Sequence, residues 1–443
     1  MKIHKAGVWC VLAGLGALTF GCAMKDGGPA DPAEAGEAKP FTVTLRHVQV
    51  RDDAKSRLTM LEDAVRLMEA EVPGLKVELE GVEDKVNRFE KLPAEMATGT
   101  PPKMFDLFGG ADTHKYVKAN RLLDVTPILN ELGLQSKFYN LDEFTVDGKV
   151  YGLPMAGFVE GVYYNKGIFR KLGVQVPATW EELLDVAGKA KAQGITPIAI
   201  ASADAWVLNM TANTLWVRTA GADSVPGFVA GKRKWTDPDV AEGFRLFETL
   251  VKRGYFQEGS LALKYAEQQN KFKAGEAAMM FDGSWANSAL LDKQKSLAAE
   301  DIGFFNFPNV GGKGDSLING SYSNGYGFSA NVDEYELRAV KAFIKAMFSE
   351  TMQKRQLTEV GVLPAMKLSD LSGVPAIVGE VLQAAGAKQF PAFDSIVQAK
   401  VRETLETGMQ ELIGGKTTPE RLLEAVQRAQ EAASKEPAVR GAR

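Results

Sequence analysis

The sequence predicts an α/β protein built from two lobes. Strand-like segments rich in β-branched residues alternate with amphipathic helical segments from residue 41 to about residue 256, a pattern typical of βα units and parallel sheets. The chain has 443 residues, of which 45% are hydrophobic and 24% are charged, an ordinary globular composition. Because one hydrophobic core stops growing at about 250–300 residues, this length favours two lobes of roughly 150–200 residues each.

The individual elements follow from side-chain periodicity and capping signals. Residues 55–71 place apolar side chains on one helical face, and residues 334–348 repeat this pattern. Thr179 with Glu182 forms a capping box, and Thr418 before Pro419 opens a helix that we expect to end near residue 433. Strands are predicted at 41–45, 75–79, 106–108, 161–164, 197–201, 277–281, 302–307 and 325–329.

The first 40 residues have the composition of a leader and a tether. Basic residues precede an apolar run over 8–20, which predicts a secretory signal peptide over 1–21. Gly21 before Cys22 resembles a bacterial lipobox, although Thr19 stands where leucine is usual, so we expect Cys22 to be lipidated. The alternative is an ordinary signal peptide with an incidental cysteine. Residues 22–40 are rich in Ala, Gly, Pro and acidic residues, which predicts a flexible tether.

Cysteine use and net charge exclude several classes of function. The cysteines, Cys10 and Cys22, both precede the predicted mature domain, so a catalytic thiol, a disulfide and a cysteine zinc site are excluded there. We expect no metal and no cofactor. The net charge of −4 argues against nucleic-acid binding, and we expect a monomer. The motifs H-E-x-x-H, G-x-S-x-G and S-x-x-K are absent, so we predict no enzymatic activity.

Four phrases carry a resemblance to a known family. They are GKVYGLP at 148–154, GVYYNK at 161–166, PATWEE at 177–182 and FKAGEAAMMFDGSW at 272–285. In this order and spacing they resemble the bacterial extracellular solute-binding proteins of family 1, the sugar-capturing subunits of ABC importers, and in particular their maltodextrin-type members.

The resemblance implies a periplasmic-binding-protein-like fold, with two α/β lobes joined by a hinge and a ligand cleft between them. The implied N-lobe comprises 41–156 and 318–364, and the implied C-lobe comprises 157–317 and 365–443. The implied function is an extracytoplasmic lipoprotein, anchored to the bacterial cell membrane, that captures a mono- or oligosaccharide and delivers it to ABC transporter permease subunits. Two alternatives stay open: a ligand-sensing subunit for a membrane kinase, and a secreted carbohydrate-active enzyme with two carboxylates about 5–9.5 Å apart.

The resemblance also implies which side chains bind the sugar. Trp285 would stack on a sugar ring, because the C–H faces of sugars pack on aromatic rings; the alternative is a buried core residue. Asp112 would accept hydrogen bonds from sugar hydroxyls or, alternatively, cap a helix. Asp204 and Trp206 form a second acid–aromatic pair, whose alternative is a helix cap and a packing residue.

The remaining predicted contacts lie at the hinge and in loops. Phe158 would line the cleft beside the hinge near residues 156–159, and Asp282 belongs to the same phrase as Trp285. His47, expected in the loop after the first strand, and Tyr322, in a loop before a later strand, complete the predicted site. The alternative for both is a solvated loop residue.

Overall fold

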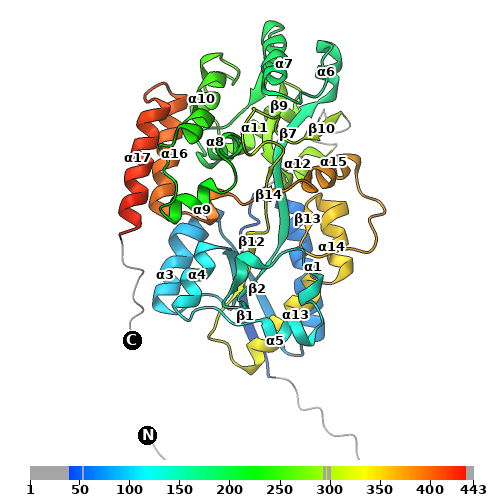
Figure 1. Cartoon of the computed structure of the whole chain (residues 1–443). Coiled ribbons are helices and arrows are strands. Elements are labelled where there is room, and N and C mark those ends of the chain that lie inside the picture. Colours follow the sequence, from blue (N-terminus) through cyan, green and yellow to red (C-terminus); the bar gives the residue numbers. More distant parts are fainter. Residues whose placement is uncertain (1–38, 52–53, 293–295, 297–300, 436–443) are drawn as a thin grey trace, which may run out of the picture. The chain divides into compact units, whose positions relative to one another are not determined.

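The computed structural model describes residues 39–51, 54–292, 296 and 301–435. From residue 40 onward, the described residues form one compact unit that contains a five-stranded and a seven-stranded sheet (Figure 1). The predicted signal peptide (1–21), Cys22 and nearly all of the predicted tether lie outside the described residues. Among the helices that are described, none is long and apolar enough to cross a membrane.

The smaller sheet is built from the N-terminal third of the chain and one later strand. Its strand order is β2-β1-β3-β12-β6. The strands are β1 (Phe41–His47), β2 (Leu75–Gly81), β3 (Met104–Phe108), β6 (Gly152–Pro154) and β12 (Asn324–Phe328). The helices in these segments are α1 (Lys55–Glu71), α2 (Asp84–Val86), α3 (Leu92–Thr98), α4 (Ala111–Lys118), α5 (Thr126–Glu131), α13 (Glu334–Met347) and α14 (Glu350–Arg355). A short hairpin, β4 (Thr145–Val146) and β5 (Lys149–Val150), precedes β6.

The larger sheet is organised around one long strand. Its order is β14-β11-β7-β9-β8, and β10 and β13 also pair with β7. The strands are β7 (Ala156–Asn165), β8 (Thr196–Ala199), β9 (Ala277–Gly283), β10 (Ile302–Phe305), β11 (Ile318–Ser321), β13 (Leu363–Pro364) and β14 (Gln389–Phe390). The associated helices are α6 (Lys166–Leu172), α7 (Trp180–Ala192), α8 (Trp206–Ala220), α9 (Ser224–Val229), α10 (Pro238–Lys252), α11 (Tyr265–Lys273), α12 (Asn287–Leu290), α15 (Ala376–Ala385), α16 (Ala399–Ile413) and α17 (Pro419–Ala433).

The expected parallel pairing is present in only part of each sheet. Strand β1 is parallel to both β2 and β3, but β12 is antiparallel to β3 and β6. In the larger sheet, β7 is antiparallel to β9, β10 and β11. The reason is that β12 and β7 directly follow a strand of the other sheet, so they do not arrive through a βα crossover, which would make them parallel to a neighbour.

The chain passes between the two sheets at short connections. Pro154 ends β6 in the smaller sheet, and Ala156 begins β7 in the larger one. Strand β11 lies in the larger sheet and β12 in the smaller one, so a second crossing runs through Tyr322 and Ser323, a few residues after the boundary expected at 318. The lobe ranges themselves stay a prediction.

Local sequence signals explain the helix boundaries. The capping box at Thr179 is present, and the Thr418 side chain accepts from the Arg421 amide at the start of α17. Helix α1 spans the predicted range of 55–71 and packs against α13 over the smaller sheet. On the larger sheet, Trp216 stacks on Phe244 with ring centroids 5.4 Å apart, which joins α8 to α10.

Candidate functional site

Four aromatic side chains meet where β8 and β9 end. Trp285 follows β9, Trp206 opens α8, Tyr265 opens α11, and Phe158 lies near the start of β7. The ring centroids are 5.1 Å apart for Phe158 and Trp285, 4.8 Å for Trp206 and Tyr265, and 6.3 Å for Trp206 and Trp285. These four residues are called the aromatic cluster below. The C-terminal end of β-strands is where α/β proteins place ligands.

Trp285 is fixed in one orientation at the end of β9. Its indole Nε1 donates a hydrogen bond to the Tyr265 hydroxyl at 2.8 Å. Its ring also covers Gly283 so closely that a Cβ added there would lie 2.2 Å from the ring. The side chain is partly buried and packs against the core of the larger sheet. Trp285 is therefore oriented by its neighbours while part of its surface remains exposed.

Asp282 lies behind the aromatic cluster. The residue is fully buried, and its carboxylate accepts from the Tyr265 hydroxyl at 2.9 and 3.0 Å. It also accepts from Gln269 Nε2 at 3.3 Å and from the Gly283 amide at 2.8 Å. The carboxylate is therefore aimed at Tyr265, which in turn orients Trp285.

Asp204 lies at the exposed side of the aromatic cluster. Its Oδ2 accepts from the backbone amide of Tyr265 at 2.9 Å, so it caps the start of α11. Its Oδ1 is 3.7 Å from Lys85 Nζ, on α2 beside the smaller sheet. One oxygen of Asp204 therefore caps a helix, as the alternative predicts, whereas the other oxygen faces Lys85 beside the smaller sheet.

Arg88 connects Asp112 to a segment that follows the larger sheet. Its Nε is 3.0 Å from Asp112 Oδ2, and its Nη1 is 3.1 Å from Asp394 Oδ2. The guanidinium also lies over the Phe108 ring, 3.3 Å from the centroid. Gly110, not Asp112, is the N-cap of α4. Asp112 is therefore an ion-pair partner of Arg88, and the capping alternative is wrong.

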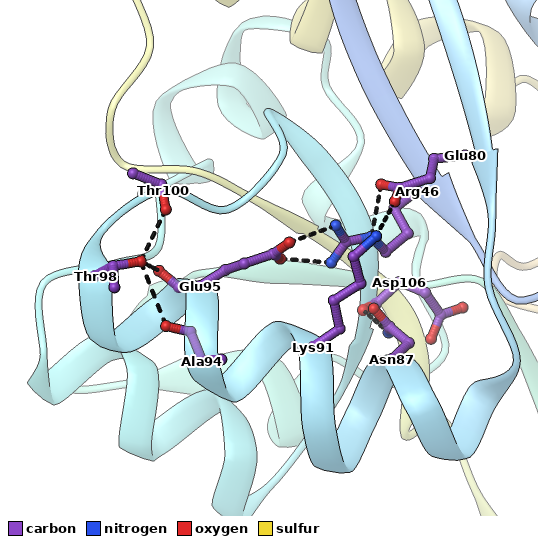
Figure 2. A network of polar contacts seen from close by, with 9 residues as sticks. All are labelled: Arg46, Glu80, Asn87, Lys91, Ala94, Glu95, Thr98, Thr100 and Asp106. Atoms are coloured by element: carbon purple, nitrogen blue, oxygen red, sulfur yellow. Dashed lines mark hydrogen bonds and ion pairs between the residues drawn. The ribbon is translucent and has the colours of Figure 1, made fainter.

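A buried arginine holds the segment that carries Arg88. Arg46 of β1 is 2% exposed; it forms a bidentate pair with Glu95 at 2.5 and 2.7 Å and donates to Glu80 at 2.8 Å (Figure 2). Lys91 also pairs with Glu80. Lys91 ends the π-helical turn η2 (Asn87–Lys91), so these contacts fix the turn against β1 and β2.

Asp106 of β3 is buried next to the same turn. Asn87 Nδ2 donates to its backbone carbonyl at 3.0 Å, as Figure 2 shows. The carboxyl is 4% exposed, and its Oδ2 has no hydrogen-bond partner among the described residues. Desolvation, together with the charge of Asp84, raises the pKa of Asp106 well above its usual value.

His47 is buried at the end of a strand, and Tyr322 is half-buried in the connection between β11 and β12. His47 is the last residue of β1 and is 5% exposed, so the expectation that it follows the strand in a loop is wrong, as is the solvated alternative. Its Nδ1 accepts from the Gln49 amide at 3.1 Å, and burial lowers its pKa. Tyr322 stacks on Tyr139 at 6.1 Å, and desolvation raises its pKa.

The structure brings together five of the eight predicted site residues around Tyr265. These are Phe158, Asp204, Trp206, Asp282 and Trp285. Asp112 and His47 lie at strand or helix ends of the smaller sheet, and Tyr322 lies between the sheets. Sequence reasoning missed Tyr265 and Arg88. The available signal for Tyr265 was its place at the start of the helix that leads into the 272–285 phrase. Within the described part of the chain, no cluster of three or more potential metal-ligating side chains occurs.

Comparison with known proteins shows which family the chain resembles. A statistical model of the family described as bacterial extracellular solute-binding protein matches residues 58–354. The multiple sugar-binding protein of Streptococcus mutans is 26% identical over 333 residues, which cover 73% of this chain and 75% of that protein.

Solved structures extend the likeness over nearly all of the described chain. A chitin oligosaccharide binding protein is 69% identical with a TM-score of 0.86, covering 89% of this chain and 99% of that one. A structure from work on xylan utilization by Caldanaerobius polysaccharolyticus is 25% identical with a TM-score of 0.80, covering 88% and 99%. The fold is therefore periplasmic-binding-protein-like, and the chain belongs to the bacterial extracellular solute-binding proteins, a family of sugar-binding components of ABC transporters rather than of enzymes.

Proposed function

We propose that this protein captures oligosaccharides of N-acetylglucosamine outside the cytoplasm and delivers them to an ABC transporter permease. The observation that carries the proposal is the aromatic cluster at the end of β9, since fixed rings beside carboxylates suit stacking on sugar faces. The class of sugar is suggested by the 69% identity to a chitin oligosaccharide binding protein, chitin being a β-linked polymer of N-acetylglucosamine.

Within this proposal the predicted site residues take different roles. Trp285 is the principal stacking platform, flanked by Phe158 and Trp206. Asp204 and Asp112 accept hydrogen bonds from sugar hydroxyls, and both carboxylates are already partly exposed, which supports this role.

The enclosed members of the predicted site act mainly by positioning other residues. Asp282 is a positioning residue that holds Tyr265, because its carboxylate is buried and directed at that hydroxyl. His47 and Tyr322 shape the ends of the site, since His47 is buried at the end of β1 and Tyr322 stacks on Tyr139 in the connection between the two sheets.

We further propose that Cys22 is lipidated and anchors the protein to the membrane through the tether at 22–40. The support is the basic and apolar leader, the small residue before Cys22 and the tether composition. An anchored receptor stays near the permease that takes its ligand.

The function is tested by isothermal titration calorimetry on the purified mature domain against chitin, cellulose, xylan and maltodextrin oligosaccharides. We expect saturable binding of the chitin series, with the ligand recovered unchanged afterwards. Binding of the maltodextrin series alone would contradict the proposed sugar class, and binding of no carbohydrate would contradict the function itself.

A further inference from the structure

A group of polar side chains is buried beside the aromatic cluster, on the same face of β7 as Phe158. Glu160 of β7 lies directly opposite Asn319 of β11 in the antiparallel register, so the two side chains share one face of the sheet. Asn319 Nδ2 donates to Oδ1 of Asn213, on α8, at 3.2 Å. Glu160 is 4% exposed and each asparagine is 1% exposed. Glu160, Asn213 and Asn319 are called the polar cluster below.

Each member of the polar cluster has an unused hydrogen-bonding atom. Among the described residues, Glu160 Oε2, Asn319 Oδ1 and Asn213 Nδ2 have no partner. The orientation of the Asn213 amide is set by the backbone, because Phe393 N donates to Asn213 Oδ1 at 3.0 Å and leaves the NH₂ group free. Buried polar groups in native proteins are almost always paired, so three unused atoms at one place point to a partner that binds there.

The polar cluster adjoins the proposed sugar platform. Phe158 is two positions before Glu160 on the same face of β7, which is a distance of about 7 Å along a strand. The Phe158 ring contacts Trp285 at 5.1 Å. An oligosaccharide that stacks on Trp285 and extends past Phe158 therefore brings its next substituent to the polar cluster.

The chemistry of the polar cluster is that of an amide partner. Burial, together with the charges of Asp394 and Asp282, raises the pKa of Glu160 well above its usual value, which favours the protonated carboxyl that can donate as well as accept. Asn213 offers N–H donors and Asn319 offers a carbonyl acceptor. An acetamido group carries one N–H, one carbonyl and one methyl group. The N–H matches the Asn319 acceptor, the carbonyl matches the Asn213 donor, and the methyl group can pack on the neighbouring Phe158 ring. A hydroxyl at the same sugar position cannot make all three contacts.

We propose that the polar cluster binds the acetamido group of an N-acetylhexosamine residue. Asn319 Oδ1 accepts from the amide N–H of the sugar, and Asn213 Nδ2, assisted by the Glu160 carboxyl, donates to the acetyl carbonyl. The inference rests on the proposed function and deepens it, because it assigns the discrimination between N-acetylated and hydroxylated sugars to three named side chains.

The test compares triacetylchitotriose with cellotriose, which has the same β-1,4 backbone and a hydroxyl in place of each acetamido group. Calorimetry on the wild-type protein should give a preference of at least about tenfold for triacetylchitotriose. Asn213→Asp keeps the acceptor for Phe393 N and replaces the free donor with an acceptor. It should reduce that preference about tenfold by weakening triacetylchitotriose, while cellotriose affinity changes less than about twofold.

A control variant separates recognition from folding. Gln356→Glu is the matched control, because Gln356 is also buried with an Nε2 that has no partner among the described residues, and it lies on a different element, the π-helical turn η7 (Gln356–Val360). It should leave the preference unchanged, and thermal unfolding reports whether each variant is folded.

The outcomes distinguish this inference from the proposed function. Equal wild-type affinity for the two trisaccharides overturns the inference even if Asn213→Asp does not fold, and leaves an oligosaccharide-binding protein in place. A folded Asn213→Asp protein with the wild-type preference also overturns it. If the wild-type protein binds neither trisaccharide and no other sugar, the proposed function fails, and the inference fails with it.

Discussion

Removing one hydroxyl group from the aromatic cluster should affect both stability and ligand binding. The Tyr265 hydroxyl donates to the buried Asp282 carboxylate and accepts from Trp285 Nε1 at 2.8 Å and from Gln269 Nε2 at 2.6 Å. Tyr265→Phe keeps the ring and its packing. Because a hydrogen bond to a charged group contributes about 1.5–3 kcal/mol, the free energy of unfolding should fall by that amount. The Trp285 indole loses its acceptor, so oligosaccharide affinity should fall about two- to tenfold.

The matched control is Tyr255→Phe. Tyr255 is also buried, and its hydroxyl donates to the Leu184 carbonyl at 3.3 Å. Losing that neutral hydrogen bond should cost about 0.5–1.5 kcal/mol and leave affinity unchanged. Urea denaturation monitored by tryptophan fluorescence and calorimetric titration with triacetylchitotriose measure the two effects. If Tyr265→Phe matches Tyr255→Phe in both assays, Tyr265 does not organise the site and this account of Trp285 is wrong.

Three further predictions follow from the sites described. Trp285→Ala should weaken binding about 10- to 100-fold, by analogy with stacking on nucleobases, and calorimetry should show no such loss for Tyr335→Ala, whose ring is 42% exposed. A large loss of stability with unchanged affinity would instead assign Trp285 to the core. Cys22→Ser should release the protein from the membrane fraction or leave its leader uncleaved, and unchanged fractionation and migration on a gel would contradict lipidation. The pKa of Asp106 is raised on folding, so the stability that this residue contributes is fully present below the unfolded pKa of about 3.8 and is lost as pH rises through the folded pKa. Asp106→Asn lacks this dependence, so its unfolding free energy relative to wild type should increase from pH 4 to pH 8 in urea titrations; a constant difference would refute the assigned shift.

Features determined by neighbouring residues were predictable from the sequence. The periodicity of 55–71 located α1, and Thr418 with Pro419 located the start of α17, because a cap and a helical face depend on residues a few positions apart. The strand and turn that present Trp285 were likewise local, since Gly283 lies only two positions away.

Features determined by distant residues were not predictable in the same way. Arg88 is held by Asp112 and by Asp394, which is 306 positions away in the sequence. No local sequence pattern indicates the pairing of Arg88 with Asp394. The burial of Asp282 depends on Tyr265, which sits on a separate helix. The antiparallel direction of β7 relative to its neighbours also depends on which sheet the preceding strand joined, which periodicity within one segment does not reveal.

The central position of β7 has a consequence for how the chain folds. This strand precedes its partners β9, β10, β11 and β13 by a long stretch of sequence. For example, the Val159 amide donates to the Ser284 hydroxyl, and these two residues are 125 positions apart. Closing such long loops before any pairing is gained slows folding, because rates fall as the sequence separation of contacts rises. The smaller sheet has local partners in β1, β2 and β3 and can begin to assemble sooner. The half of the protein that holds the aromatic cluster should therefore be the last to acquire native structure, and during that interval its apolar strands are the segments most open to aggregation.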